Sequence, residues 1–128
     1  MKNIIVADAS AILAFLMDEP GAKKVAQNLD KLLLSSVNFC EVASKFSERG
    51  MPEAEIEEVL SPFSQLVVPF DSETALIAGN MRKASRDLSL SLGDRACLAL
   101  GKKLGALVYT CDAAWAKVRL GVEIEVIR

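Results

Sequence analysis

The chain has 128 residues, with 15 Lys and Arg against 17 Asp and Glu and no His, so its formal net charge is −2. This length predicts a single domain over residues 1–128 and leaves no room for a second domain with its own core. With 52% hydrophobic and 25% charged residues the chain can bury a core, which excludes an intrinsically disordered protein. Because only 5% of the residues are aromatic, the core must be mainly aliphatic, as in a parallel sheet covered by helices.

No apolar run approaches the ~20 residues that a membrane-spanning helix needs, and the first residues lack the apolar core and cleavage site of a signal peptide. We therefore expect a cytoplasmic protein without a membrane anchor. Cys40, Cys97 and Cys111 have no C-x-x-C spacing and are expected to be small buried residues. The alternative is a zinc site formed by the three thiols and a carboxylate. The absence of His and of a zinc-ligand spacing between the cysteines disfavours it.

The apolar pattern predicts strands and helices that alternate along the chain. Residues 3–7 form a short buried strand that ends at Asp8, and Ser10 can cap a helix from Ala11 to about Asp18. A helix over 22–31 and a strand over 32–36 follow. Further on, we expect helices over 37–48 (with Asn38 as N-cap), from Pro52, over 72–87, from Gly93-Asp94 to Gly105 and around Trp115, and strands over 66–69, 106–110 and 122–127.

Strands that alternate with helices predict an α/β fold in three layers, with a central, mostly parallel sheet of four to five strands flanked by helices. Such sheets carry their functional groups at the carboxyl ends of the strands. Asp8 and Asp112 each follow a predicted strand, so both are expected at this edge.

Two further acids, Glu41 and Asp94, fall in the first turns of predicted helices. Taken singly, each acid has a structural interpretation, because Asp is common in turns and at helix N-termini. Taken together, four converging carboxylates would repel one another unless a cation were bound. Carboxylates without His favour Mg²⁺ or Mn²⁺ over zinc, and such an ion can activate water and stabilise charge on a phosphate.

Four segments resemble the motifs of the PIN-domain family. Residues 4–11 (Ile-Ile-Val-Ala-Asp-Ala-Ser-Ala) are similar to the family's first strand, which ends in an Asp, and residues 36–42 (Ser-Val-Asn-Phe-Cys-Glu-Val) to its second motif. Residues 91–101 (Ser-Leu-Gly-Asp-Arg-Ala-Cys-Leu-Ala-Leu-Gly) and 108–115 (Val-Tyr-Thr-Cys-Asp-Ala-Ala-Trp) are similar to the third and fourth. The motifs cover nearly the whole chain in the family's order, and by length the chain is most similar to VapC-type toxins. Ala113 departs from the pattern, in which a basic residue is frequent.

The resemblance implies a metal-dependent endoribonuclease, the toxin of a toxin–antitoxin pair, that is inhibited by a cognate antitoxin and forms homodimers. It implies that Asp8, Glu41, Asp94 and Asp112 are both the catalytic residues and the ligands of Mg²⁺ or Mn²⁺.

Several other residues are candidates for supporting roles. Ser10 and Thr110 can orient a carboxylate or a metal-bound water, although helix capping and hydrogen bonding at the strand end explain them equally well. Arg82, Arg86 and Arg95 are candidate RNA contacts, whereas Lys102 and Lys103 are assigned to a solvated helix face. Trp115 is expected in the core rather than stacked on a base.

Two other functions fit parts of the sequence. A catalytically inactive PIN-like module that binds RNA or protein is disfavoured because all four acids are present. A magnesium-dependent phosphatase is disfavoured because that class needs a D-x-D strand end, and position 10 is Ser.

Overall fold

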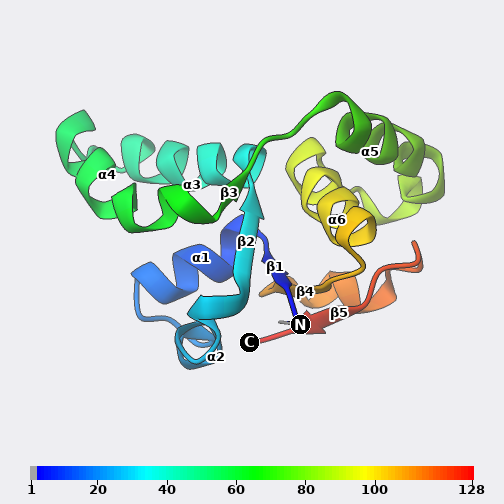
Figure 1. Ribbon diagram of the computed structural model, residues 1–128, viewed down its shortest axis with the longest axis horizontal. Coiled ribbons are helices and arrows are strands. Elements are labelled where there is room, and N and C mark those ends of the chain that lie inside the picture. Colours follow the sequence, from blue (N-terminus) through cyan, green and yellow to red (C-terminus); the bar gives the residue numbers. More distant parts are fainter. Residues whose placement is uncertain (1–2) are drawn as a thin grey trace.

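The structure, a computed structural model, describes residues 3–128. Its central sheet has five strands in the order β3-β2-β1-β4-β5, and all neighbouring strands are parallel (Figure 1). The strands are β1 Ile5–Ala7, β2 Leu32–Ser35, β3 Val67–Val68, β4 Leu107–Thr110 and β5 Ile124–Val126. In this register Ile5 lies opposite both Leu32 and Leu107. The predicted α/β class with a parallel sheet is confirmed.

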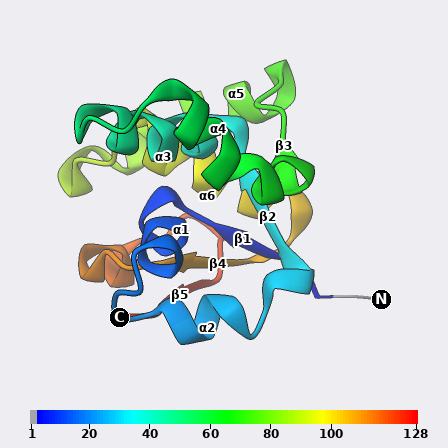
Figure 2. The same ribbon diagram turned by 90° about the vertical axis from the view of Figure 1, so that its left-hand side faces the viewer.

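Helices cover both faces of the sheet. They are α1 Ala9–Leu16, α2 Ala22–Ala26, α3 Ser36–Glu48, α4 Glu53–Leu60, α5 Ser72–Ala84 and α6 Leu92–Leu104. Because successive strand residues point to opposite faces, Ile5 and Ala7 belong to the core under α1–α4, whereas Val6 belongs to the core under α5 and α6. Figure 1 shows α1–α4 to the left of the sheet and α5 and α6 to the right. At the carboxyl ends of the strands, α3 packs against α6 (Figures 1 and 2).

Two predicted helices are shorter than expected. The helix predicted over 22–31 ends after Ala26 and is followed by a separate 3₁₀ turn, Leu29–Lys31. The side chain of Asn28 donates to the carbonyl of Lys24 and to the Tyr109 hydroxyl, which ends the α-helical pattern locally. The helix predicted over 72–87 ends at Ala84, where the Ser85 hydroxyl donates to the carbonyl of Met81 at 2.6 Å.

Three helices begin two or three residues before the candidate caps. A cap is predicted at Asn38, and capping is one of two possible roles for Ser10 and Asp94; the capping residues are Asp8, Ser35 and Ser91. Each of these side chains accepts from a backbone N–H in the first turn of its helix. The helices therefore begin earlier than predicted, and the three candidate caps lie inside their first turns.

The three cysteines differ in burial. Cys97 is buried and Cys111 is partly buried, but Cys40 is exposed on α3, which corrects the expectation that all three are buried. Trp115 lies in the core, as predicted, within the 3₁₀ segment η4 Ala113–Lys117. Within residues 3–128, no helix combines the length and the apolarity that crossing a membrane requires.

Candidate functional site

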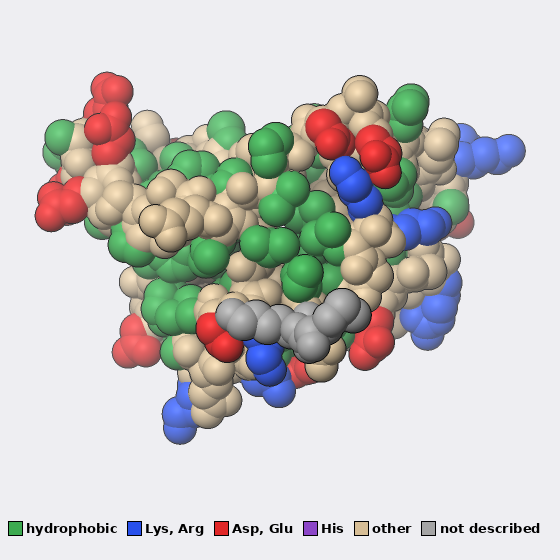
Figure 3. All heavy atoms as spheres, viewed as in Figure 1, with side chains coloured by type: hydrophobic (Ala, Val, Ile, Leu, Met, Phe, Trp, Pro, Cys, Tyr) green, Lys and Arg blue, Asp and Glu red, His purple; other side chains and the backbone are tan. Residues whose placement is uncertain are grey.

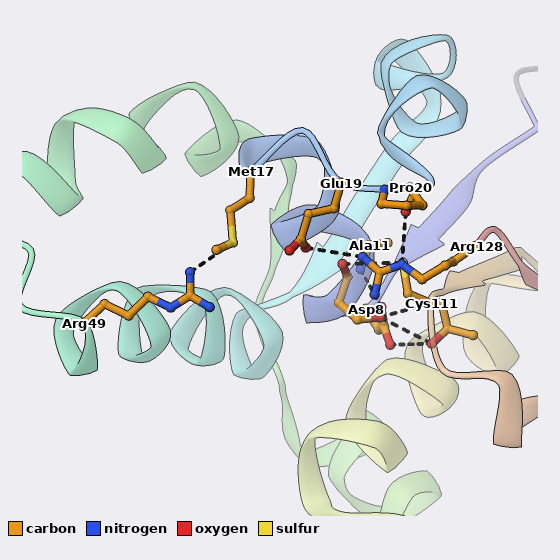
Figure 4. A network of polar contacts seen from close by, with 10 residues as sticks. Asp8, Ala11, Met17, Glu19, Pro20, Arg49, Cys111 and Arg128 are labelled. Carbon is orange, nitrogen blue, oxygen red and sulfur yellow. Dashed lines mark hydrogen bonds and ion pairs between the residues drawn. The ribbon is translucent and has the colours of Figure 1, made fainter.

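Asp8 follows β1 directly and is buried, with 6% of its surface exposed. One oxygen, Oδ1, accepts from the Ser10 hydroxyl at 2.7 Å and from the Ala11 backbone N–H at 2.9 Å. The other, Oδ2, accepts from the Thr110 hydroxyl at 2.7 Å. Figure 4 shows Asp8 next to Ala11 and Cys111, at the point where the ends of β1 and β4 meet. Three donors therefore fix the carboxyl group in one orientation.

The environment of Asp8 opposes its ionisation. Burial raises the pKa of this carboxyl from 3.8 to about 6, although the hydrogen bonds from Ser10, Thr110 and Ala11 lower it. The negative charge of Asp94 raises the pKa further. A nearby positive charge would therefore favour the charged form of Asp8.

Glu41 is held against α6 by Asn38. The buried Asn38 amide donates to Oε1 of Glu41 at 2.8 Å and to the carbonyl of Gly93 at 3.0 Å. A Cβ atom at position 93 would overlap the Glu41 carboxylate, so only glycine allows the carboxylate to lie there. The amide oxygen of Asn38 has no hydrogen-bond partner among residues 3–128. Asn38 thus fixes Glu41 instead of capping a helix.

Asp94 is the third residue of α6 and forms a capping box with Ser91. Its Oδ2 accepts from the Ser91 backbone N–H at 2.9 Å, while the Ser91 hydroxyl accepts from the Asp94 N–H at 3.2 Å. One Asp94 oxygen is therefore engaged in the helix start, and the carboxylate is held at the N-terminus of α6.

Three acids, Asp8, Asp94 and Glu41, lie within electrostatic reach of the buried thiol of Cys97. Burial is the main cause of the raised pKa of this thiol, and the negative charges of the three acids raise it further. None of the three has an ion-pair partner among the described residues. Nor, within residues 3–128, do any three Asp, Glu, Cys or His side chains lie close enough to hold a metal ion. The acids thus share one region without forming a closed set of ligands.

Asp112 is joined to this region through Thr110. The Thr110 hydroxyl, which donates to Asp8, accepts from the Asp112 backbone N–H at 3.1 Å. The Asp112 carboxylate itself is exposed and accepts from the Ala114 N–H as the cap of η4. The Ser10 hydroxyl also accepts from the Cys111 N–H at 2.9 Å. Ser10 and Thr110 therefore tie α1 to the end of β4, and both orient Asp8.

The three candidate RNA contacts differ in position. Arg82 and Arg86 are exposed. Arg95 is partly buried, and its Nη1 donates to the carbonyl of Ala78 on α5 at 3.1 Å. Arg95 therefore joins α6 to α5 in addition to any contact with a ligand.

Two adjoining grooves run from Glu41 along α3. The first, of about 650 Å³, lies between α3 and Phe70, and the second, of about 610 Å³, lies between α3 and α4. Cys40, Ser44 and Glu48 line both grooves, so the two are continuous. Their acidic residues are Glu41, Glu48, Glu53 and Glu57.

Sequence reasoning missed Ser91 and the role of Gly93. The pattern Ser91-x-x-Asp94 is that of a capping box and could have identified the start of α6. The close approach of Glu41 to Gly93 could not be found in the same way, because it depends on how α3 packs against α6.

Comparison with known proteins extends this description. Residues 5–120 match the PIN domain family. No curated protein matches the sequence significantly. The fold is similar to a chain of DNA-bound VapBC from Salmonella typhimurium, with a TM-score of 0.76 and 19% identity over 97% of this chain and 98% of that one.

Two other solved structures are similar at the same level. One is FitAcB from Neisseria gonorrhoeae, with a TM-score of 0.70 and 19% identity over 94% of this chain and 96% of that one. The other is VapBC-5 from Mycobacterium tuberculosis, a toxin–antitoxin system, with a TM-score of 0.67 and 18% identity over 99% of each chain. The structural similarity concerns the fold alone. The match to the PIN domain family covers residues 5–120, which is most of the chain, and the protein therefore belongs to this family.

Proposed function

We propose that the protein is a Mg²⁺- or Mn²⁺-dependent endoribonuclease, with Asp8, Glu41, Asp94 and Asp112 as its site. The observation that carries this proposal is that the Glu41 carboxylate lies against Gly93, next to Asp94, and that neither of these acids nor the buried Asp8 has an ion-pair partner among residues 3–128. Membership of the PIN domain family supports the same function.

The chemistry of the candidate ligands suits a hard divalent cation. All the candidate ligands are carboxylate oxygens, which Mg²⁺ and Mn²⁺ prefer, and the chain has no His. Burial, and to a smaller extent the charge of Asp94, raises the pKa of Asp8, so a cation bound nearby would favour its ionised form. The Oδ1 of Asn38, which has no hydrogen-bond partner within the described residues, adds a buried acceptor beside Glu41. When bound, such a cation lowers the pKa of water and stabilises negative charge on a phosphate.

The protein's own contribution is to hold the carboxylates in place. Ser10, Thr110 and the Ala11 N–H fix Asp8, Asn38 fixes Glu41, and Ser91 fixes Asp94. Each carboxylate therefore keeps its orientation before RNA binds, and little ordering remains to be done during the reaction. The backbone N–H of Asp112 is linked to Asp8 through the Thr110 hydroxyl, which supports including Asp112 in the proposed site.

Cleavage of a labelled single-stranded RNA tests this proposal. We expect cutting in Mg²⁺ or Mn²⁺, none in EDTA, and a loss of at least about 10²-fold in Asp8→Asn, Glu41→Gln or Asp94→Asn. Asp30→Asn, which changes an acid outside the four motifs, serves as the control and should cut normally. An intact fold with no cleavage in either metal would favour the inactive RNA- or protein-binding module instead.

We further propose that the protein is the toxin of a toxin–antitoxin pair and works as a homodimer. Similar folds occur in solved toxin–antitoxin complexes. The grooves along α3 begin at Glu41, contain apolar side chains such as Phe70 and Met51, and carry four glutamates. These features suit an antitoxin segment with apolar and basic residues, one of which would reach the acids. An antitoxin that co-purifies but leaves RNA cleavage unchanged would contradict this mode of inhibition, and light scattering would test the dimer.

A further inference from the structure

The positive charge of this acidic chain is concentrated in one part of the sequence. Between Ile77 and Gly121 there are eight Lys and Arg against three Asp and Glu, a net charge of +5, so the remaining residues carry −7. This segment comprises the end of α5, all of α6, β4, η4 and the loop that leads to β5. Figure 3 shows Lys and Arg side chains along the edge of the molecule beside α5, and Asp and Glu at the opposite end over α4.

A groove of about 510 Å³ lies within this basic segment, at the end of α6 opposite to Asp94. Ile77, Asn80 and Met81 of α5 line one side, and Lys102, Lys103 and Arg119 line the other. Lys103 is balanced by Asp71 at 3.3 Å and Glu73 at 3.7 Å. Neither Lys102 nor Arg119 has an acidic partner within ion-pair distance in the part of the chain that is described.

Local bonds hold one of these two charges at the groove. Nη1 of Arg119 donates to the carbonyls of Ala116 and Val118, each at 2.9 Å, which places the guanidinium against the loop after η4. Lys102 lies close to Gly121 in the same loop. Both cations therefore face a cavity that contains no carboxylate among its lining residues.

We propose that this groove binds the phosphate backbone of an RNA strand, at a place separate from the acidic site. The inference rests on the proposed function, since RNA is the polyanion that such an enzyme meets. No aromatic side chain lines the groove, so base stacking is not available there, whereas unpaired cations suit phosphates of any sequence. Lys102 lies eight positions after Asp94 in α6, about 12 Å along the helix, so one strand can reach both places.

The direction of α5 allows one RNA strand to contact both the groove and the acidic site. Arg95 near the start of α6 bonds to Ala78 of α5, while Lys103 near the end of α6 pairs with Asp71 before α5, so the two helices run antiparallel. The exposed Arg82, Lys83 and Arg86 at the end of α5 therefore lie toward the Asp94 end of α6. An RNA strand following α5 would pass these cations between the groove and the acids.

Binding of a labelled single-stranded RNA of about 16 nucleotides, measured by fluorescence anisotropy in EDTA so that no cutting occurs, tests the inference. The double variant Lys102→Gln/Arg119→Gln should bind about 5- to 10-fold more weakly at low salt, and the slope of log affinity against log salt should fall by about 1.4. Lys23→Gln/Lys31→Gln removes the same charge from the region of α2, at the other end of the molecule, and should bind like the wild type. Melting curves confirm that both variants are folded.

The outcomes separate this inference from the proposed function. If Lys102→Gln/Arg119→Gln binds RNA as the wild type does, or if the control variant loses as much affinity, the groove is not an RNA-binding site. If the double variant lost binding to poly-glutamate but kept binding to RNA, the groove would be a site for an acidic protein partner and not for RNA. In Mn²⁺ the double variant should raise KM for the same RNA and leave kcat unchanged. A wild type that binds this RNA through the groove but never cuts it contradicts the nuclease and leaves the groove standing.

Discussion

At Asp8, one carboxylate caps α1 and supplies the central charge of the candidate site. Capping requires only an oxygen acceptor for the Ala11 N–H, which an amide also provides. Ionisation is opposed, because burial raises the pKa of this carboxyl to about 6. In the unfolded chain its pKa has the ordinary value of 3.8, so the folded, metal-free protein holds this proton more tightly. The resulting stabilisation is complete below pH 3.8 and is lost as the pH rises through about 6.

Asp8→Asn should therefore stabilise the metal-free protein at neutral pH. The expected gain is on the order of 1–3 kcal/mol at pH 7, and it should shrink as the pH falls toward 4. The oxygen of the introduced amide can accept from the Ala11 N–H and the Ser10 hydroxyl. Its NH₂ group can donate to the Thr110 hydroxyl, which can act as an acceptor instead of a donor. Thermal melting in EDTA across this pH range measures the difference as a shift of a few degrees.

Asp71 is the matched control, because it caps α5 as Asp8 caps α1. Its carboxylate is exposed, and hydrogen bonds from the backbone N–H and hydroxyl of Thr74 lower its pKa to about 2. Its ionised form is therefore stabilising above pH 3.8, and that contribution is lost as the pH falls through about 2. Asp71→Asn should lower the melting temperature at pH 7 or leave it unchanged. A rise equal to that of Asp8→Asn would show that burial of Asp8 is not the cause.

Among the elements, the strands and the order of helices could be predicted from sequence, whereas the helix starts could not. The aliphatic runs at 3–7, 32–36 and 106–110 have one plausible role, because each is short, apolar and flanked by polar residues. At helix starts, several Ser, Asp and Asn residues compete as caps within three positions, and local pattern does not choose between Asp8 and Ser10. The packing of α3 on α6 decides where Asn38 and Glu41 lie, and this is a long-range contact.

The contact of α3 with α6 makes Gly93→Ala informative. The added methyl would overlap the Glu41 carboxylate, which can swing away because it ends a flexible side chain. Stability should change by less than about 1 kcal/mol, since Ala is also the better helix former. RNA cleavage should fall by about 10²-fold, because Glu41 would leave its place beside Asn38.

Gly79→Ala provides the comparison for this variant. It makes the same change in the middle of α5, where an added Cβ meets no atom within 4 Å. It should raise stability by about 0.5–1 kcal/mol and leave cleavage unchanged. Equal cleavage by both variants would mean that the observed position of Glu41 is not needed for activity.

At the scale of the whole molecule, the site lies where the two halves of the core meet. Asp8 caps α1 and Glu41 lies on α3, and both helices cover one face of the sheet, whereas Asp94 lies on α6, which covers the other. Packing between α3 and α6 and the hydrogen bond from Asn38 to Gly93 join the two faces at this edge. Repulsion between the negative charges of Asp8 and Asp94 works against that junction when no cation balances them.

A cation that binds all three acids should consequently stabilise both halves together. On the proposed function, Mn²⁺ at about 100 times its dissociation constant should raise the free energy of unfolding by about 2.7 kcal/mol. Hydrogen exchange should slow in the first turns of both α3 and α6, because opening either element would release the ion. The double variant Glu41→Gln/Asp94→Asn makes one candidate ligand on each of the two facing helices, α3 and α6, neutral. Its melting temperature in EDTA should equal or exceed that of the wild type. Its stabilisation by Mn²⁺ should largely disappear. If the double variant responded to Mn²⁺ as the wild type does, the ion would be binding elsewhere, and the acids at this edge would need another explanation.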